Sequence, residues 1–162
     1  PAGLVRGGIA GITGIEKKLA KADRDTLYDG KVNPIASFPG TGFTIFGQKT
    51  LQTKSSALDR VNVRRLLIEL KEFIGNQATN LVFEQNTIQT RNSFLSAVNP
   101  YLERVVQRQG LFSFRVVMDD TNNTADVVDR NQLIGQIFIQ PAKTAEYIVL
   151  DFVVEPTGAT FN

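Results

Sequence analysis

Residues 147–154 place the strongest constraint on the fold, because they are apolar on both faces of an extended chain. In a strand, one face would carry Tyr147, Val149, Asp151 and Val153, and the other Ile148, Leu150, Phe152 and Val154. A strand of this kind needs cover on both sides. Residues 156–158 then turn the chain, and Phe161 needs cover as well. The cover comes either from the same fold or from another molecule, and the residues alone leave that choice open.

The rest of the sequence predicts an α/β or α+β fold, with two long amphipathic helices beside a small mixed sheet. Residues 58–77 and 87–109 repeat apolar side chains at spacings of three and four. We expect Pro100 to kink or split the second helix and Gly110 to end it. Other expected elements are a glycine-rich loop at 1–14, short helical turns at 15–29, a turn-rich connection at 125–131, extended chain at 35–42 and strands at 43–47, 111–118, 132–140 and 147–154.

Composition argues against several classes of protein. The 162 residues suffice for one domain, and they include neither Cys nor His. Thiol nucleophiles, disulfides, the usual zinc sites and imidazole acid–base chemistry are therefore excluded. The net charge of +2 is spread along the chain, so charge gives no indication of nucleic acid. No apolar run approaches the ~20 residues that span a bilayer. These observations favour a protein that is not an enzyme and that inserts into no membrane.

Two glycine-rich stretches resemble nucleotide-binding loops only in part. Gly40 and Gly42 have the spacing of the first two glycines of a dinucleotide-binding loop, but Ile45 stands where the third would be. The glycines at positions 7, 8, 11 and 14 lack the Lys-Ser/Thr of a phosphate-binding loop. We predict turns at both places and no cofactor.

A cluster of oxygen ligands leaves a metal site open as an alternative. Its members are Asp119, Asp120, Asn122, Asp126 and Asp129, which could serve a carboxylate-dependent metal enzyme. The spacing lacks the glycine and the distal Glu of a calcium loop. Asp and Asn in turns more often bond to nearby backbone groups. We therefore predict a solvated loop without a metal.

The second helix carries Glu103, Arg104 and Arg108 on its polar side. Such charges usually form a solvated face, although they would steer and register a second surface that docked there. A further alternative for the whole chain is a self-contained soluble adaptor that uses its last strand internally.

Several short stretches occur in a familiar order along nearly the whole chain. They are residues 1–9, 32–35, 38–42, 61–66, 109–110, 114–116, 120–124 and 141–148. The stretches at 61–66 and 141–148 are the most specific. Together they resemble the C-terminal region of contractile-tail sheath proteins of bacteriophages, a family that includes the sheaths of R-type pyocins and related injection machines.

This resemblance implies a mechanical function. Sheath subunits form hexameric rings or a helical lattice around a tail tube, between a baseplate and a tail terminator. Contraction of the lattice drives the tube through the host cell envelope during genome delivery. The energy comes from the difference between two packings of the same subunits. The resemblance thus implies a virion component that is assembled in the host bacterial cytoplasm, uses no cofactor and is a fragment of a longer chain.

The resemblance also implies roles for particular segments. Residues 1–145 would be the inner, conserved sheath domain, and residues 146–162 an arm donated as a strand to a neighbouring subunit. The arm residues that would contact the neighbour are Tyr147, Ile148, Val149, Leu150, Phe152, Val153, Val154 and Phe161. Residues 141–144 or 156–158 would be the flexible joint. Glu103, Arg104 and Arg108 would face the tube.

Overall fold

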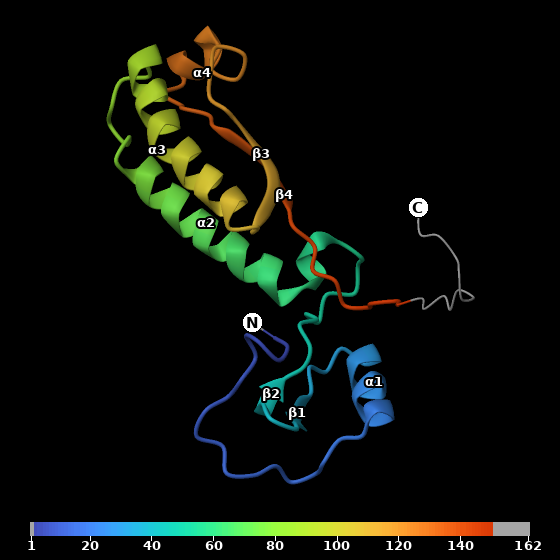
Figure 1. Ribbon diagram of the computed structural model, residues 1–162. Helices are drawn as coiled ribbons and strands as arrows, with labels where there is room; N and C mark the ends of the chain where they lie inside the picture. Colours follow the sequence, from blue (N-terminus) through green and yellow to red (C-terminus); the bar gives the residue numbers. More distant parts are fainter. Residues whose placement is uncertain (1, 151–162) are drawn as a thin grey trace, which may run out of the picture.

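The computed structural model describes residues 2–150 and shows an α+β fold (Figure 1). Its helices are α1 (Lys21–Asp29), α2 (Val61–Thr79), α3 (Ile88–Gln107) and α4 (Ala125–Asp129), with a single 3-10 turn, η1 (Ala57–Asp59). Its strands are β1 (Ile35–Phe38), β2 (Gly42–Ile45), β3 (Leu111–Val117) and β4 (Gln136–Pro141). The strands form two antiparallel hairpins, β1–β2 and β3–β4. The α+β alternative is thus confirmed, whereas the small sheet that was expected to be mixed consists, within residues 2–150, of two separate antiparallel pairs.

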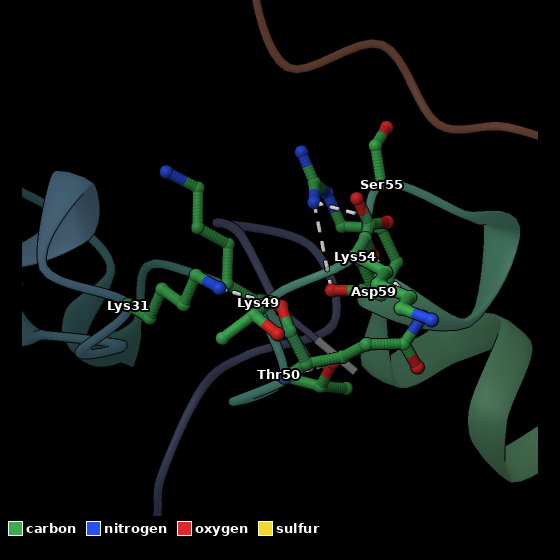
Figure 2. A pocket seen from close by; sticks show the side chains of 9 residues that line it. Lys31, Lys49, Thr50, Lys54, Ser55 and Asp59 are labelled. Atoms are coloured by element: carbon green, nitrogen blue, oxygen red, sulfur yellow. Dashed lines mark hydrogen bonds and ion pairs between the residues drawn. The ribbon is translucent and has the colours of Figure 1, made fainter.

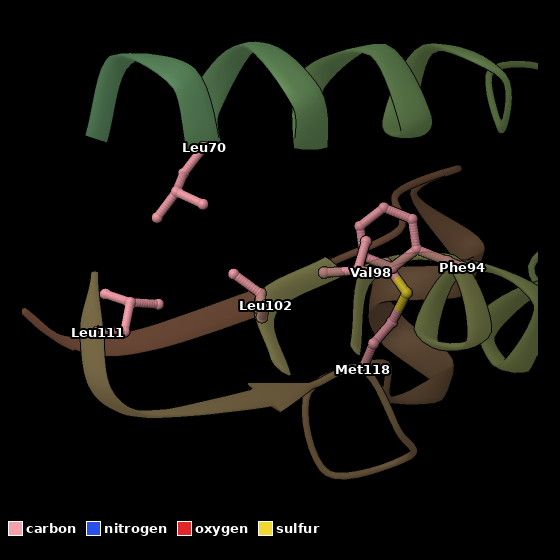
Figure 3. Close-up of a cluster of buried hydrophobic side chains, with 6 residues drawn as sticks. All are labelled: Leu70, Phe94, Val98, Leu102, Leu111 and Met118. Carbon is pink, nitrogen blue, oxygen red and sulfur yellow. The ribbon is translucent and has the colours of Figure 1, made fainter. Parts of the chain in front are cut away.

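The larger part of the molecule, called here the helical body, contains α2, α3, β3, α4 and β4 (Figure 1). Helix α3 lies between α2 and the β3–β4 hairpin (Figure 3). The buried centre consists of Leu70 from α2, Phe94, Val98 and Leu102 from α3, Leu111 from β3, and Met118 just after β3. Stacking of Phe73 on Tyr101, with ring centroids 3.8 Å apart, adds a second contact between α2 and α3. The spacing of apolar residues therefore predicts both helices and the faces that they bury.

Of the two effects predicted for Pro100, a kink or a split, the split is wrong, because α3 continues through Pro100 as one helix. Val98 and Leu102, on either side of the proline, are fully buried, and their packing holds both halves in one helix. The helix ends where the N–H groups of Gln109 and Gly110 donate to the carbonyls of Val106 and Val105. Gln109, with φ of 61°, takes the left-handed position, so the expected terminator is displaced by one residue. Gly110 is required for a different reason, since a Cβ there would lie 2.9 Å from Cγ1 of Val105.

The smaller part, called here the N-terminal body, contains β1, β2 and α1 (Figure 1). Gly40, between β1 and β2, and Gly42, the first residue of β2, both have positive φ, which confirms the predicted turn. Gly7 lies against β2, where its carbonyl accepts from the N–H of Ile45 at 2.8 Å. A Cβ on Gly7 would come within 2.5 Å of the Ile45 carbonyl oxygen, so the close approach requires glycine. The guanidinium of Arg24 in α1 lies 5.2 Å from the Phe38 ring and joins the helix to the hairpin.

The largest differences from the sequence predictions fall in residues 125–136. Residues 125–129 form the short helix α4 in place of a turn-rich connection, and β4 begins at Gln136 rather than at 132. Buried Asn123 explains the late start, because its side chain bonds to both the N–H and the carbonyl of Ile134. Among residues 2–150, no helix is both long enough and apolar enough to cross a membrane.

The packing predicts that Leu102→Ala lowers the free energy of unfolding by about 2–5 kcal/mol, because it leaves a cavity in the buried centre. Urea denaturation followed by circular dichroism measures the loss. The control is Ile68→Ala on α2, whose side chain is 56% exposed and whose loss should stay within about 0.5 kcal/mol. Equal losses in the two variants would contradict the assignment of the core.

Candidate interaction site at the root of the C-terminal segment

The chain after β4 runs past the start of α2 and then away from both bodies (Figure 1). Tyr147, Ile148, Val149 and Leu150 are 79%, 79%, 83% and 70% exposed. The strand predicted to begin at Tyr147 is absent from the described part, since residues 147–150 pair with no described strand. A strand needs an edge to bond to, and these residues meet none within residues 2–150. Phe152, Val153, Val154, Phe161 and the alternative joint at 156–158 lie outside the described residues.

The residues just before this exposed run are held in place, and Glu146 makes the strongest contact. Its two carboxylate oxygens accept from Nε and Nη2 of Arg60, at 2.6 and 3.0 Å. This two-point geometry fixes the carboxylate in the plane of the guanidinium. The third guanidinium nitrogen, Nη1, lies 3.1 Å from Asp59. The Glu146 side chain is 14% exposed, in contrast to the residues that follow it.

Two further hydrogen bonds hold the chain between β4 and Glu146. The N–H of Ala142 donates to the carbonyl of Gly110 at 3.2 Å. The side-chain amide of Gln48 donates to the hydroxyl of Thr144. Residues 142–146, called here the arm root, are therefore attached both to the end of α3 and to the loop between β2 and η1.

Arg60 is itself positioned by the backbone around it. It stands at the N-cap of α2 and pairs with Lys49 in an isolated antiparallel bridge. The next residue, Val61, donates its N–H to the carbonyl of Gln48 at 2.8 Å. Asn33 bonds through its side chain to both the N–H and the carbonyl of Lys49, at 2.8 and 2.9 Å. The guanidinium is thus built on a segment that joins the N-terminal body to the first turn of α2.

Electrostatics favour an ionised Glu146. Burial alone would raise the pKa of Glu146, but hydrogen bonds from Arg60 and Tyr28, together with the charge of Arg60, hold the pKa below its ordinary value. Burial raises the pKa of Tyr28, and the hydrogen bond to Glu146 raises it further. The site therefore contains an ionised carboxylate, a guanidinium and a neutral phenol, an arrangement suited to holding a chain in position.

A small hollow of about 250 Å³ beside Arg60 is lined by three lysines (Figure 2). Lys31 donates to the carbonyl of Gln52 at 2.5 Å, and Lys49 donates to the carbonyl of Tyr28 at 2.8 Å. Lys49 also lies 4.0 Å from the centre of the Tyr28 ring. Two of the three ammonium groups thus join the loop between β2 and η1 to the end of α1 and the residues after it, which makes the hollow part of the support for Arg60.

The charged face predicted on the second helix is exposed. Glu103 and Arg104 lie near the end of α3, and Arg108 is its C-cap residue. The Arg104 guanidinium lies 5.9 Å from the centre of the Tyr101 ring. Arg108 also lines a groove of about 1010 Å³, whose lining includes the arm root as well. The proposed contact of these three residues with a tube stays a prediction.

The acidic loop makes the predicted hydrogen bonds to nearby backbone groups and also an ion pair to α3. The Asp119 carboxylate accepts from the N–H and the hydroxyl of Thr121, at 2.9 and 2.5 Å, and these bonds lower its pKa. Asp120 pairs with Arg91 at 2.8 Å and Asp126 with Arg130 at 2.9 Å, while Asp129 is exposed. Within residues 2–150, acidic groups nowhere gather in threes that could hold a metal ion. The arrangement gives no support to the metal-enzyme alternative.

Sequence reasoning did not identify Arg60, Gln48 or Tyr28 as site residues. Their convergence depends on pairings between segments that are far apart in the chain, and local patterns carry no trace of such pairings. One signal was present, because Glu146 is the single charged residue between Thr144 and Leu150. A carboxylate directly before an apolar run suggests an anchor that requires a cation.

The lowered pKa of Glu146 predicts how stability depends on pH. Because the folded pKa lies below the ordinary value of 4.5, Glu146 stabilises the fold above that pH, and this contribution disappears as the pH falls through the folded pKa. The difference in thermal midpoint between the wild-type chain and Glu146→Gln should therefore be largest near pH 6 to 7 and should shrink in acid. Glu84→Gln, at an exposed carboxylate, is the control. A difference between wild type and Glu146→Gln that is constant with pH would contradict the ion pair.

Comparisons with solved structures show the fold. A chain of the anti-feeding prophage baseplate matches with a TM-score of 0.79 at 22% identity, over 91% of this chain and 43% of that one. A chain from the contracted PVC sheath complex of an extracellular contractile injection system matches with a TM-score of 0.78 at 24% identity, over 86% of this chain and 42% of the other.

Comparisons of the amino-acid sequence find proteins of higher identity. Tail sheath proteins of Vibrio phage KVP40 and Enterobacteria phage T4 are 43% and 40% identical over 99% and 100% of this chain. The chain spans only about a quarter of their length, 24% and 25% respectively. The family model described as the phage tail sheath C-terminal domain matches residues 53–155. Because that match covers well over half of the sequence, the chain belongs to the phage tail sheath C-terminal domain family.

Proposed function

We propose that this chain is part of a structural subunit of a contractile tail sheath, which polymerises around a tail tube and contracts to drive the tube through the host cell envelope. Its partners are further copies of the same subunit, the tube protein, and the baseplate and terminator proteins. Its place is the virion tail, after assembly in the host cytoplasm. The work comes from a change of packing between subunits, so no residue is assigned a catalytic role.

Family membership supports this proposal, and so do the names of the similar proteins. Relatives from three phages are named tail sheath proteins. One of the similar solved structures is described as the helical sheath of the anti-feeding prophage in its contracted state.

The observation that carries the proposal is the exposure of residues 147–150 beside a firmly held root. Four consecutive apolar side chains at 70–83% exposure leave a substantial apolar surface in water. Donation to a neighbour's sheet would cover these side chains and also satisfy the backbone hydrogen bonds of the segment. The alternation of its side chains would set the register.

The β3–β4 hairpin is the proposed acceptor in the neighbouring copy. Both sheets in residues 2–150 contain only two strands, so both strands of this hairpin present an outer edge. At seven and six residues, β3 and β4 are longer than β1 and β2. They therefore offer the longer edge for an added strand.

The self-contained adaptor is the second candidate function. It requires the apolar run to pack within its own subunit, whereas residues 147–150 are uncovered by any part of residues 2–150. A sheath subunit and an adaptor also differ in size distribution, because only the sheath subunit forms long polymers.

Removal of residues 146–162 should leave a folded chain that does not polymerise, because the buried core of the helical body lies entirely before residue 146. Circular dichroism checks the fold, and sedimentation with negative-stain microscopy checks the polymers. The control is Leu51→Ser in the untruncated 162-residue chain, which removes a different apolar side chain that is 82% exposed. Sheath-length polymers from the truncated chain would defeat the proposal of strand donation.

The charged face of α3 generates a separate prediction. Replacing Arg104 and Arg108 by Glu should weaken assembly on tubes and make the remaining assembly less sensitive to salt, because the attraction between opposite charges is lost. Co-sedimentation with tubes at several salt concentrations measures both effects. The matched control replaces Arg64 and Arg65, which are exposed on α2, by Glu. Unchanged co-assembly of the Arg104 and Arg108 variant would refute the tube contact and leave strand donation untouched.

A further inference from the structure

We infer that Glu146, clamped by Arg60, is the fixed point from which the arm leaves the subunit, and that this clamp sets the direction in which the arm reaches a neighbouring copy. The functional part of the inference rests on the strand donation proposed above. The clamp itself rests on the geometry of the arm root.

Contacts at residues 142, 144 and 146 argue against a joint at residues 141–144. Ala142 is bonded to the end of α3, and Thr144 is bonded to Gln48. Glu146 then closes the segment with two bonds to one guanidinium. A joint at residues 141–144 would require several of these contacts to break together. The first position where the chain is free of the subunit is therefore Tyr147.

Within residues 143–150, which are otherwise exposed, Glu146 is the half-buried point at which the chain is held. The side chain of Glu146 is 14% exposed, whereas Tyr147 is 79% exposed. The described residues beyond Tyr147 remain at 70% exposure or more. A held carboxylate followed at once by an uncovered chain is the arrangement expected of a pivot.

The clamp also draws its groups from both bodies of the fold. Tyr28 comes from the end of α1, whereas Arg60 begins α2. Gln48 lies between β2 and η1 and bonds to the arm root through Thr144. A relative displacement of the two bodies would therefore move the point at which the arm leaves. In this way the exit direction of the arm is coupled to the arrangement of its own subunit.

A positioning role for Arg60, beyond simple stabilisation, depends on the planar shape of its guanidinium. Arg60 binds both carboxylate oxygens and holds the carboxylate in one plane, while Asp59 holds the remaining nitrogen. A lysine at position 60 would keep the charge but would supply no such plane. Arg60→Lys should therefore disturb the direction of the arm even where the fold remains intact.

The test measures the direction of the arm before any assembly takes place. The chain contains no cysteine, so spin labels attach only at the introduced pair Lys71→Cys on α2 and Tyr147→Cys. Double electron–electron resonance should give a narrow distribution of distances between the labels at positions 71 and 147. This distribution should become roughly twofold broader in Glu146→Gln and in Arg60→Lys, because both changes remove the two-point contact. Glu84→Gln, at an exposed carboxylate in the connection between α2 and α3, is the matched control and should change nothing. Unlabelled chains with the same substitutions at 146, 60 and 84 are then assayed for polymers.

The outcomes separate the clamp from the proposed function. Distributions that stay narrow in both clamp variants, with the fold intact, would overturn the inference. Broader distributions together with shorter or fewer polymers would support it in full. Broader distributions with polymers of normal length would overturn the claim that the clamp directs the arm to a neighbouring copy. If the wild-type chain forms no polymers but its clamp variants still broaden the distribution, the clamp stands and the proposed function fails.

Discussion

The interaction on which the rest depends is the Arg60–Glu146 ion pair, because it holds the chain directly before an uncovered apolar segment. Inside the helical body, Val98 and Leu102 are fully buried, as is normal for a packed core. Residues 147–150 have the same apolar character and no such cover within residues 2–150. Burial of apolar surface contributes about 25 cal/mol per Å². Under the proposed strand donation, the run associates with another surface, and the clamp at Glu146 sets the point from which that association begins.

The Arg60–Glu146 pair can contribute to stability because it is partly shielded from water. Fully exposed ion pairs contribute little to stability, since water competes for both partners. Here the two side chains are 29% and 14% exposed, and the carboxylate is held through both oxygens. Hydrogen bonds from Lys31, Lys49 and Asn33 hold the loops next to Arg60. The fold thus concentrates its polar contacts at the point where the proposed arm leaves.

The sequence predicted the elements better than their connections. Periodicity located α2 and α3, because their buried faces repeat at helical spacing. It allowed a split at Pro100, where the helix continues with buried residues on either side, and it missed the left-handed conformation of Gln109. The division of the strands into two hairpins and the convergence of Tyr28 and Arg60 on Glu146 depend on long-range pairing. No local pattern carries that information. Family resemblance supplied the expected role of the arm, and the structure added the detail of its root.

The most direct measurement of the central claim is hydrogen–deuterium exchange at the backbone amides of residues 147–150, compared between monomer and polymer. The account predicts rapid exchange in the monomer, where these residues pair with no described strand, and strong protection after polymerisation. Protection that is already complete in the monomer would contradict the account, because it would show that the apolar run is bonded within its own subunit.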